Sequence, residues 1–208
     1  MFHSEITGVG SYVPKKTVTN KEIQNIVDTS DQWITTRTGI SERRVSTEES
    51  TAQLAIKAAR YAIKHANIEP AEIDLVVLAT ITPDFFTPST ASLVQASLGL
   101  KDVASFDISA GCTGFIYGLQ IANQFIKSGQ SKCVLVIGAE VLSKVLDWND
   151  RNTCVLFGDG AGAAILKRSN KEGIVSTYTG SRGDLDGLLT IPAVSLKNPF
   201  ITNQSMVN

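Results

Sequence analysis

One cysteine lies where a strand-like run of residues gives way to a helix-like run. Residues 106–115 read Phe-Asp-Ile-Ser-Ala-Gly-Cys-Thr-Gly-Phe, so the thiol of Cys112 sits on a turn of small residues. At the first turn of a helix, backbone N–H groups lack intrahelical partners and the helix dipole is positive, and both favour a thiolate. This position makes Cys112 a candidate nucleophile, although a lone cysteine in apolar surroundings is more often a buried structural residue.

The other two cysteines, Cys133 and Cys154, stand within apolar runs. Burial in the core is the better interpretation for both of them. The three cysteines show no CxxC spacing, which fits a reducing compartment and predicts neither a metal site nor a disulfide framework. A redox-sensing thiol at Cys112 would need a nearby resolving cysteine, which the spacing does not supply.

A second group of residues could bind a nucleotide. Ser30 or Asp31 can cap a short helix that Gly39 ends, and this helix places Trp33 and Arg37 four residues apart on one face. An aromatic plane beside a guanidinium can stack on a base and contact phosphate. The alternative is a half-buried tryptophan beside a solvated arginine, and the spacing alone favours that alternative.

Helices and strands that alternate through the middle of the chain would hold these residues in place. Helices are predicted at 50–67, 89–98 and 113–128, and strand-length apolar runs lie at 74–80, 103–108 and 132–138. Continuous apolar runs are typical of strands covered on both faces, so the alternation predicts an α/β fold with parallel strands and helices on its faces. The helix at 113–128 carries apolar residues around most of its circumference, and we expect it to be buried.

The two ends of the chain are less regular. A short strand is predicted at 6–13, and another at 173–179. Residues 157–166 have side chains too small for a free strand and are suited to close packing. This segment is rich in glycine but lacks the Walker spacing, so it is not interpreted as a phosphate loop. From Gly180 onward the sequence loses its periodicity.

The composition excludes several classes of protein. The 208 residues include 43% hydrophobic and 19% charged residues, which is typical of a globular domain and not of a disordered chain. A net charge of -1 provides no bulk field for nucleic acid. No apolar run approaches the ~18 residues of a membrane span, and the start of the chain does not resemble a signal peptide. We therefore expect a cytoplasmic protein that binds neither nucleic acid nor membrane.

Several strings of residues, in this order, resemble the β-ketoacyl-[acyl-carrier-protein] synthase III enzymes of the thiolase superfamily, the initiating condensing enzymes of bacterial fatty-acid synthesis. These strings lie at 8–14, 28–40, 107–115, 150–151 and 157–164. The resemblance runs from about Ile6 to the end of the chain. It implies a thiolase-like α/β/α/β/α fold built from two similar halves. Residues 1–170 would supply the first half and residues 171–208 a connecting strand and loops, with the chain truncated before the second half.

The resemblance also implies a reaction. Cys112 would attack the thioester of acetyl-CoA or another short acyl-CoA and become acylated, while its own backbone N–H helps to hold the oxyanion. Malonyl-acyl-carrier protein would then lose its carboxylate, and the resulting carbanion would capture the acyl group to give a β-ketoacyl product. The implied protein is a homodimer that uses the CoA thioester as a substrate and needs no other cofactor and no metal.

Binding residues are carried over in the same way. Trp33 and Arg151 match the family residues that sandwich the adenine of CoA, and Thr29 and Arg37 match neighbouring contacts to the nucleotide. The resemblance therefore reverses the interpretation that spacing alone favours for Trp33. Phe157 matches a pocket aromatic near the thiol.

The sequence departs from the family pattern at two places. Family members complete the site with a His and an Asn from the second half, whereas the two histidines of this chain, His3 and His65, precede Cys112 and lie outside any matching motif. We therefore expect acyl transfer to the thiol without full condensation. His65 is interpreted as a surface residue that complements the dipole at its helix C-terminus.

The second departure is Thr87, which follows the unusual pair Phe85-Phe86 in a loop bracketed by Pro83 and Pro88. Some family members carry at this position a bulky aromatic that closes the acyl pocket across the dimer interface. Our hypothesis is a pocket that accepts somewhat more than acetyl, unless Phe86 turns into it.

Two other functions stay open. The chain could be a CoA-binding or dimerisation module that does not catalyse condensation. It could also be a related starter enzyme of the superfamily, such as a thiolase or an alkylquinolone or polyketide starter, because pocket shape decides which acyl group is used.

Overall fold

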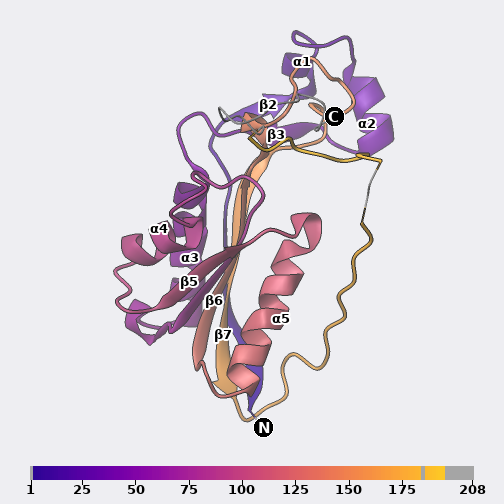
Figure 1. Cartoon of the computed structure of the whole chain (residues 1–208). Coiled ribbons are helices and arrows are strands. Elements are labelled where there is room, and N and C mark those ends of the chain that lie inside the picture. Colours follow the sequence, from indigo (N-terminus) through magenta and orange to yellow (C-terminus); the bar gives the residue numbers. More distant parts are fainter. Residues whose placement is uncertain (1, 184–185, 195–208) are drawn as a thin grey trace, which may run out of the picture.

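The computed structural model describes residues 2–183 and 186–194. It is a mixed α/β fold in which one five-stranded sheet has helices on both faces, and a small two-stranded sheet with two helices lies beyond one end (Figure 1). The predicted α/β class is confirmed. Among the described residues, no helix is long and apolar enough to cross a membrane.

The strand order in the large sheet is β1-β7-β6-β4-β5. The strands are β1 (His3–Tyr12), β4 (Leu75–Ala79), β5 (Ala104–Ile108), β6 (Cys133–Val141) and β7 (Asp159–Ser169). β4 runs parallel to β5 and β6, as the apolar runs predicted. β7 is antiparallel to both β6 and β1, so the small residues predicted to pack closely form a strand inside the sheet. The carboxyl ends of β4, β5 and β6 lie at the end of the sheet where β7 begins.

Helices α3 (Thr51–Ala66) and α4 (Thr90–Ser97) cover one face of the sheet, and α5 (Gly114–Lys127) covers the other (Figure 1). Ser50 caps the start of α3 and Asn67 its end, which matches the predicted helix bounds of 50–67. The contact between α3 and β1 is close, since a Cβ on Gly10 would lie 2.3 Å from the backbone nitrogen of Ala62. Glycine in β1 is therefore required by the approach of the two backbones.

The prediction that α5 is buried around most of its circumference is wrong. Its buried residues, Gly114, Gly118, Ala122, Asn123 and Ile126, follow helical spacing along the side that faces the sheet. The side chain of Ile116 is 46% exposed, and Phe115 is only partly buried. The sheet covers one side of the helix, and no other described helix or strand covers the opposite side (Figure 1).

The smaller unit contains β2 (Thr17–Thr19) paired with β3 (Glu42–Arg44), together with α1 (Asn20–Ile23) and α2 (Asp31–Thr38). Ser30 caps α2, and Gly39 ends it in the left-handed region with φ 73°. The end at Gly39 was predicted, and of the two candidate caps, Ser30 and Asp31, the structure shows Ser30. Three single 3-10 turns, η1 (Pro70–Glu72), η2 (Gly111–Thr113) and η3 (Leu142–Lys144), complete the elements.

Residues 173–179 do not form the predicted strand. The amide of Ile174 donates to the carbonyl of Ser4 at 3.0 Å, but no ladder of backbone bonds follows. The segment instead runs alongside α5, where the hydroxyl of Thr179 donates to Gln120 at 2.9 Å (Figure 1). A strand-like sequence without a neighbouring strand edge remains an extended loop. The predicted loop from Gly180 onward lies partly outside the described residues.

Candidate functional site

The Cys112 turn occupies the carboxyl end of β5. The amide of Thr80, which follows β4, donates to the carbonyl of Ile108 at 3.1 Å and ties the ends of β4 and β5 together. The chain then forms η2 with Gly111 at φ 53° and enters α5 at Gly114. The space beside Gly114 is tight, because a Cβ there would lie 2.9 Å from the Cβ of Ala79. The sheet thus places the amino end of α5, and with it the Cys112 turn.

The three cysteines have different surroundings. Cys112 is exposed, whereas Cys133 and Cys154 are buried as predicted. Burial raises the pKa of Cys133 to about 12, and burial also raises the pKa of Cys154. Because thiolates rather than thiols react as nucleophiles, the two buried cysteines are inert. Cys112 is the one cysteine that a substrate can reach.

The indole of Trp33 is flanked by two guanidinium groups. Arg37, one turn further along α2, lies 4.5 Å from the centroid of the ring, and Arg151 lies 5.1 Å from it. Arg151 comes from the loop after η3, and its Nη1 donates to the carbonyl of Asp28 at 3.0 Å. The predicted pairing of Trp33 with Arg37 is confirmed, and Arg151, which the resemblance implied as the partner of Trp33, lies over the same ring. A planar group with phosphates would find both stacking and charge here.

Thr29, the fourth residue predicted near the nucleotide, lies four positions before Trp33. Its Oγ1 is buried and has no hydrogen-bond partner among the described residues. A buried hydroxyl without a partner costs about 1–3 kcal/mol, so this oxygen is suited to a group that arrives from outside. The neighbouring Ser30, by contrast, has a partner for its hydroxyl oxygen, which accepts from the amide of Trp33 as the cap of α2.

Arg43 links the segments that form the Trp33 cluster, although no pattern in the sequence indicates this role. The Trp33 cluster consists of Trp33, Arg37 and Arg151. Its guanidinium is buried in the smaller unit, donates to the side chain of Asn20 at 2.8 Å and to the carbonyl of Val155 at 2.9 Å. Burial lowers its pKa from the usual value. Because Val155 follows the loop of Arg151, this one side chain fixes that loop against the segment that carries Trp33.

The predicted pocket residues are Phe86, Thr87 and Phe157, and they lie in two separate loops. The ring of Phe86 is 82% exposed, and Phe85 and Thr87 are exposed beside it. Phe157 is half-buried at the approach to β7. In this structure the ring of Phe86 therefore projects outward and closes no pocket.

The histidines do not contribute to the Cys112 turn. His65 lies near the end of α3, and its Nδ1 is 3.1 Å from the amide nitrogen of Val9 and 3.0 Å from the carbonyl of the same residue. It is an exposed residue near a helix C-terminus, as predicted, and it belongs to the opposite face of the sheet from α5. His3 begins β1. No cluster of three metal-ligating side chains occurs in the described part of the chain.

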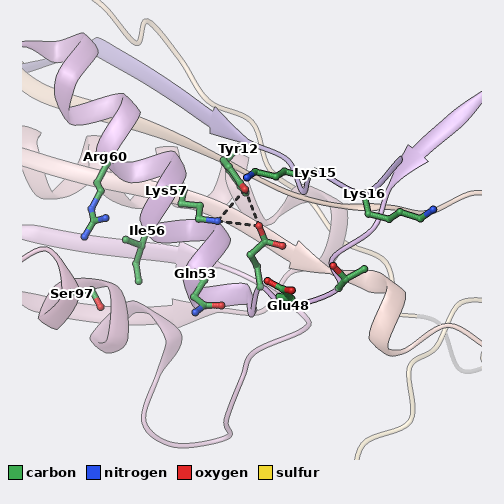
Figure 2. A pocket seen from close by; sticks show the side chains of 11 residues that line it. Tyr12, Lys15, Lys16, Glu48, Gln53, Ile56, Lys57, Arg60 and Ser97 are labelled. Atoms are coloured by element: carbon green, nitrogen blue, oxygen red, sulfur yellow. Dashed lines mark hydrogen bonds and ion pairs between the residues drawn. The ribbon is translucent and has the colours of Figure 1, made fainter. Parts of the chain in front are cut away.

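A hollow of about 700 Å³ lies outside these centres, beside α3 (Figure 2). Lys57 donates from Nζ to the hydroxyl of Tyr12 and to a carboxylate oxygen of Glu49, each at 3.0 Å. These bonds raise the pKa of Lys57 and lower that of Glu49, with the hydrogen bond to Tyr12 the larger cause for the lysine and the bond to Lys57 for the glutamate. Lys57 and Glu49 form an ion pair in this hollow, and none of the predicted site residues lines it.

Comparison with known proteins gives relatives over nearly the whole chain. The family model described as 3-oxoacyl-[acyl-carrier-protein] synthase III matches residues 106–183, which include Cys112 and α5. The β-ketoacyl-[acyl-carrier-protein] synthase III of Clostridium acetobutylicum is 53% identical over 204 residues. That alignment covers 98% of this chain and 63% of the relative. The chain therefore spans less than two thirds of the length of this curated relative.

Solved structures agree with this similarity. The crystal structure of 3-oxoacyl-[acyl-carrier-protein] synthase III from Aquifex aeolicus is 58% identical, with a TM-score of 0.80 over 81% of this chain and 55% of that chain. The priming β-ketosynthase of the R1128 polyketide biosynthetic pathway is 42% identical, with a TM-score of 0.80 over 82% of this chain and 52% of that chain. The thiolase-like α/β fold implied by the resemblance is confirmed.

Proposed function

We propose that this chain, which is 53% identical to a β-ketoacyl-[acyl-carrier-protein] synthase III over 98% of its own length, belongs to that family and is the acyl-accepting part of the condensing enzyme that initiates bacterial fatty-acid synthesis. The observation that carries this proposal is the exposed thiol of Cys112 at the amino end of α5, within the segment that the family model matches. The substrate of the first step is acetyl-CoA or another short acyl-CoA.

In the first step, the thiolate of Cys112 attacks the thioester carbonyl and expels CoA as its thiolate, so that the acyl group is held on the enzyme as a new thioester. The backbone N–H of Cys112 itself donates to the developing oxyanion. The position of the turn supports this role, since the amino end of a helix supplies N–H groups and a positive dipole to negative charge.

Trp33 and Arg151 hold the adenine of CoA between an aromatic plane and a guanidinium, and Arg37 and Thr29 contact the rest of the nucleotide. The distances of 4.5 and 5.1 Å from the two guanidinium groups to the indole support this assignment. The buried, unpartnered hydroxyl of Thr29 also supports it. Stacking on an aromatic residue contributes about 1–3 kcal/mol per base in nucleic-acid complexes, and we expect a similar contribution for adenine.

Phe157, Phe86 and Thr87 border the acyl pocket in this proposal. Thr87 is smaller than the aromatic residue that some family members carry, so the pocket accepts acyl groups somewhat longer than acetyl. The outward position of the Phe86 ring supports an open pocket. A steep fall in the rate of Cys112 acylation beyond acetyl-CoA would contradict this part of the proposal.

The second step requires a decarboxylation, in which malonyl-acyl-carrier protein loses CO₂ and its carbanion attacks the acyl group on Cys112. In the family, a His and an Asn stabilise the oxygens of this step. This chain has no histidine after Cys112, so residues 1–170 by themselves hold only the first half of the catalytic site. Alone, the chain takes up an acyl group and does not complete the condensation.

The wider setting follows from the same proposal. The protein is a homodimer, acts in the cytoplasm and uses no resident cofactor or metal, because a thiol and a thioester suffice for the acyl transfer. Its three free cysteines fit a reducing compartment. The acyl-carrier protein is its macromolecular partner.

A second candidate is a starter enzyme of secondary metabolism. The similarity to the priming β-ketosynthase of the R1128 polyketide pathway favours it. Both candidates share the acylation of Cys112, and they differ in which acyl group is preferred. A competition among acetyl-CoA and longer or branched acyl-CoA thioesters distinguishes them, since a fatty-acid initiator of this kind selects short acyl groups.

The test is incubation of the purified chain with acetyl-CoA, followed by malonyl-acyl-carrier protein, with both the protein and the small products analysed by mass spectrometry. We expect one acetyl group on the protein and no β-ketoacyl product. A protein that binds CoA without becoming acetylated would be a binding module, and the proposed function would be wrong.

A further inference from the structure

A carboxylate that the sequence did not single out lies at the carboxyl ends of the parallel strands. Glu140 belongs to β6, two residues after Gly138, whose position packs against the ring of Phe115 in α5. Since alternate residues of a strand share a face, Glu140 projects from the same face of the sheet as α5. Burial raises the pKa of Glu140, while its hydrogen bonds act in the opposite direction.

Glu140 accepts hydrogen bonds from three consecutive residues that follow β4. The donors are the hydroxyl of Thr80 at 3.2 Å, the amide of Ile81 at 2.9 Å and the hydroxyl of Thr82. A carboxylate with this many donors holds the chain more firmly than a neutral acceptor would. One side chain of β6 thus fixes the first three residues of the loop that leads to Phe86.

Two of the residues that donate to Glu140, Thr80 and Thr82, are also connected to the proposed functional elements. Thr80 donates its amide to the carbonyl of Ile108, four residues before Cys112. Thr82 leads into the loop that ends at Thr87, and its hydroxyl accepts from the amide of Val141 at 3.0 Å. Glu140 therefore connects the start of the Phe86 loop with the strand end that carries the Cys112 turn.

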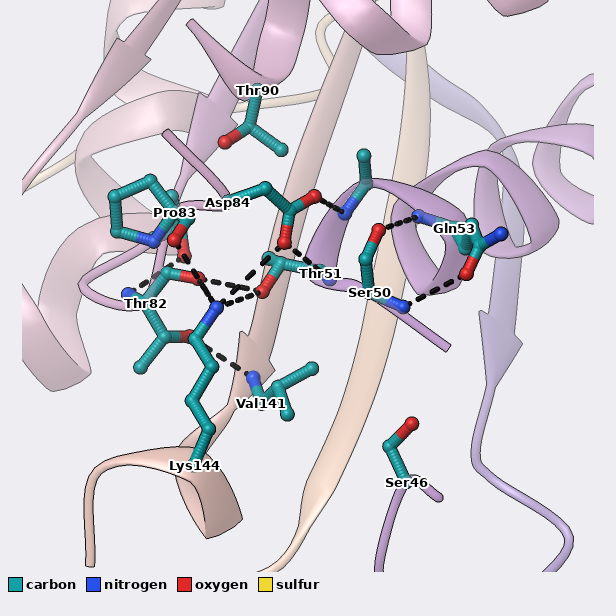
Figure 3. Close-up of polar contacts among 12 residues, drawn as sticks. Ser46, Ser50, Thr51, Gln53, Thr82, Pro83, Asp84, Thr90, Val141 and Lys144 are labelled. Carbon is teal, nitrogen blue, oxygen red and sulfur yellow. Dashed lines mark hydrogen bonds and ion pairs between the residues drawn. The ribbon is translucent and has the colours of Figure 1, made fainter. Parts of the chain in front are cut away.

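The next residues of the loop are held from the other side (Figure 3). The carboxylate of Asp84 accepts from the amides of Thr51 and Ala52 at 2.9 and 2.8 Å, at the start of α3. Lys144 donates from Nζ to the carbonyl of Thr82 at 2.8 Å and to the carbonyl of Pro83 at 3.1 Å. The base of the loop is fixed by charged groups, while its tip at Phe85, Phe86 and Thr87 stays exposed.

We propose that Glu140 is a positioning residue for acyl selection: it fixes the base of the loop whose tip, at Phe86 and Thr87, borders the acyl pocket across the interface of the proposed homodimer. This inference rests on the proposed function, because it takes the acyl group on Cys112 as the group to be selected. Glu140 does not touch the reacting atoms in this account. It acts through Thr80, Ile81 and Thr82.

Glu140 could serve only to join β4 to β6. A second carboxylate that joins the same two strands provides a control for that role. At their opposite ends, Asp74 accepts from the amides of Lys132 and Cys133 at 2.6 and 3.3 Å. Asp74 thus bridges the same strands far from the loop. A change at Asp74 should reproduce any effect that comes only from weaker joining of β4 and β6.

The experiment compares Glu140→Gln with Asp74→Asn in two measurements. The first is hydrogen exchange of the backbone amides in a peptide that covers residues 81–88. The second is the rate at which Cys112 is acylated by a series of acyl-CoA thioesters from acetyl to hexanoyl. A glutamine oxygen replaces one carboxylate oxygen, but its amide group cannot accept from a hydroxyl, so at least one donor loses its partner.

We expect exchange in the loop to become several-fold faster in Glu140→Gln and to stay unchanged in Asp74→Asn. The ratio of hexanoyl to acetyl acylation rates should change by about threefold or more in Glu140→Gln only, because small displacements near a reacting group alter rates strongly. Glu140→Asp keeps the charge on a shorter side chain and should give an intermediate change in both measurements. It replaces Glu140→Gln in the experiment if that variant does not fold.

Equal effects in both variants, or no change in exchange and acyl ratio for Glu140→Gln, would overturn the inference. Faster exchange in Glu140→Gln with an unaltered acyl ratio would also overturn it, because the loop would then move without affecting selection. A wild-type protein that takes no acyl group at all would contradict the proposed function and with it the role in selection. In that case the exchange measurement would still decide whether Glu140 fixes the loop.

Discussion

Side chains from two separate segments build the Trp33 cluster, whereas the backbone builds the Cys112 turn. At Trp33, guanidinium groups from α2 and from the loop of Arg151 converge on one indole. At Cys112, the thiol takes its place from a glycine with φ 53° and from the close approach of Gly114 to Ala79. One centre depends on side-chain charge and planarity, and the other depends on the absence of side chains.

The difference implies that nucleotide binding and acyl transfer can be damaged separately. Loss of a planar or charged group should weaken binding of CoA while leaving the thiol reactive. Loss of the thiol, or crowding of the backbone around it, should stop or slow acyl transfer while leaving the Trp33 cluster intact. Four changes, from the largest expected effect to the smallest, test this separation.

Cys112→Ser should lower the rate of acyl transfer from acetyl-CoA by a factor on the order of 10⁴ or more, because a serine hydroxyl here lacks the base that would activate it. The affinity for CoA should not change. Acetyl incorporation measured by mass spectrometry and CoA binding measured by calorimetry check the two halves of this statement. Residual acetylation at the wild-type rate would show that another residue accepts the acyl group.

Trp33→Leu should weaken binding of CoA about tenfold or more, since it removes the aromatic ring that both Arg37 and Arg151 contact. Alkylation of Cys112 by iodoacetamide should proceed at the wild-type rate. Trp148→Leu is the matched control, because Trp148 packs in the same apolar cluster and its Nε1 donates to the carbonyl of Ser143 at 3.1 Å. A similar loss of affinity in both variants would attribute the effect to packing and would break the comparison.

Gly114→Val should destabilise the protein by roughly 1–3 kcal/mol, because its side chain would overlap Ala79 at the start of α5. It should also change the rate of Cys112 alkylation by iodoacetamide. Gly162→Val is the control, since an added Cβ at Gly162 in β7 meets nothing within 4 Å. Urea unfolding gives the stability of each variant, and equal stability of the two would contradict a backbone-built turn.

Acid should destabilise the protein partly through Glu22 in the smaller unit. Hydrogen bonds from Lys16, then from the backbone and hydroxyl of Thr19, lower the pKa of Glu22 to about 2. Because this value lies below the unfolded value of 4.5, the contribution of Glu22 is fully present above pH 4.5 and is lost as the pH falls toward 2.

Glu22→Gln should therefore remove most of this part of the pH dependence of the free energy of unfolding. Glu22 is exposed enough for solvent to screen the pair, so this is the smallest of the four effects. Urea unfolding at pH 6 and at pH 3, in wild type and variant, checks it. An unchanged difference between the two pH values in Glu22→Gln would show that the acid sensitivity arises elsewhere.

Local signals in the sequence predicted the parts of the fold that local chemistry decides. A helix end is defined by one residue and its immediate neighbours: Gly39 ends α2 as predicted, Ser30 is the cap of the two candidates Ser30 and Asp31, and the predicted bounds of 50–67 match α3 and its two caps. The parallel pairing of β4 with β5 and β6 followed from apolar runs that alternate with helices. The exposed thiol of Cys112 likewise follows from a turn of small residues.

Features that depend on distant partners escaped the sequence. Residues 173–179 have the composition of a strand, but a strand also needs an edge to pair with. The apolar circumference of α5 gave no indication that one side would lack a cover. Arg43 and Glu140 looked like ordinary charged residues, because their partners lie as far away as Val155 and Thr80. A single acidic residue two positions after a buried run is the one signal that could have drawn attention to Glu140.

The most direct test of the account is to locate the acyl group after incubation with acetyl-CoA. Peptide mass spectrometry can assign the modification among Cys112, Cys133 and Cys154, because the three lie in separate segments. The account predicts a single acetyl thioester on the peptide that contains Cys112, and none on the two buried cysteines. Acetylation of another residue, or a protein that binds CoA and releases it with every cysteine unmodified, would contradict it.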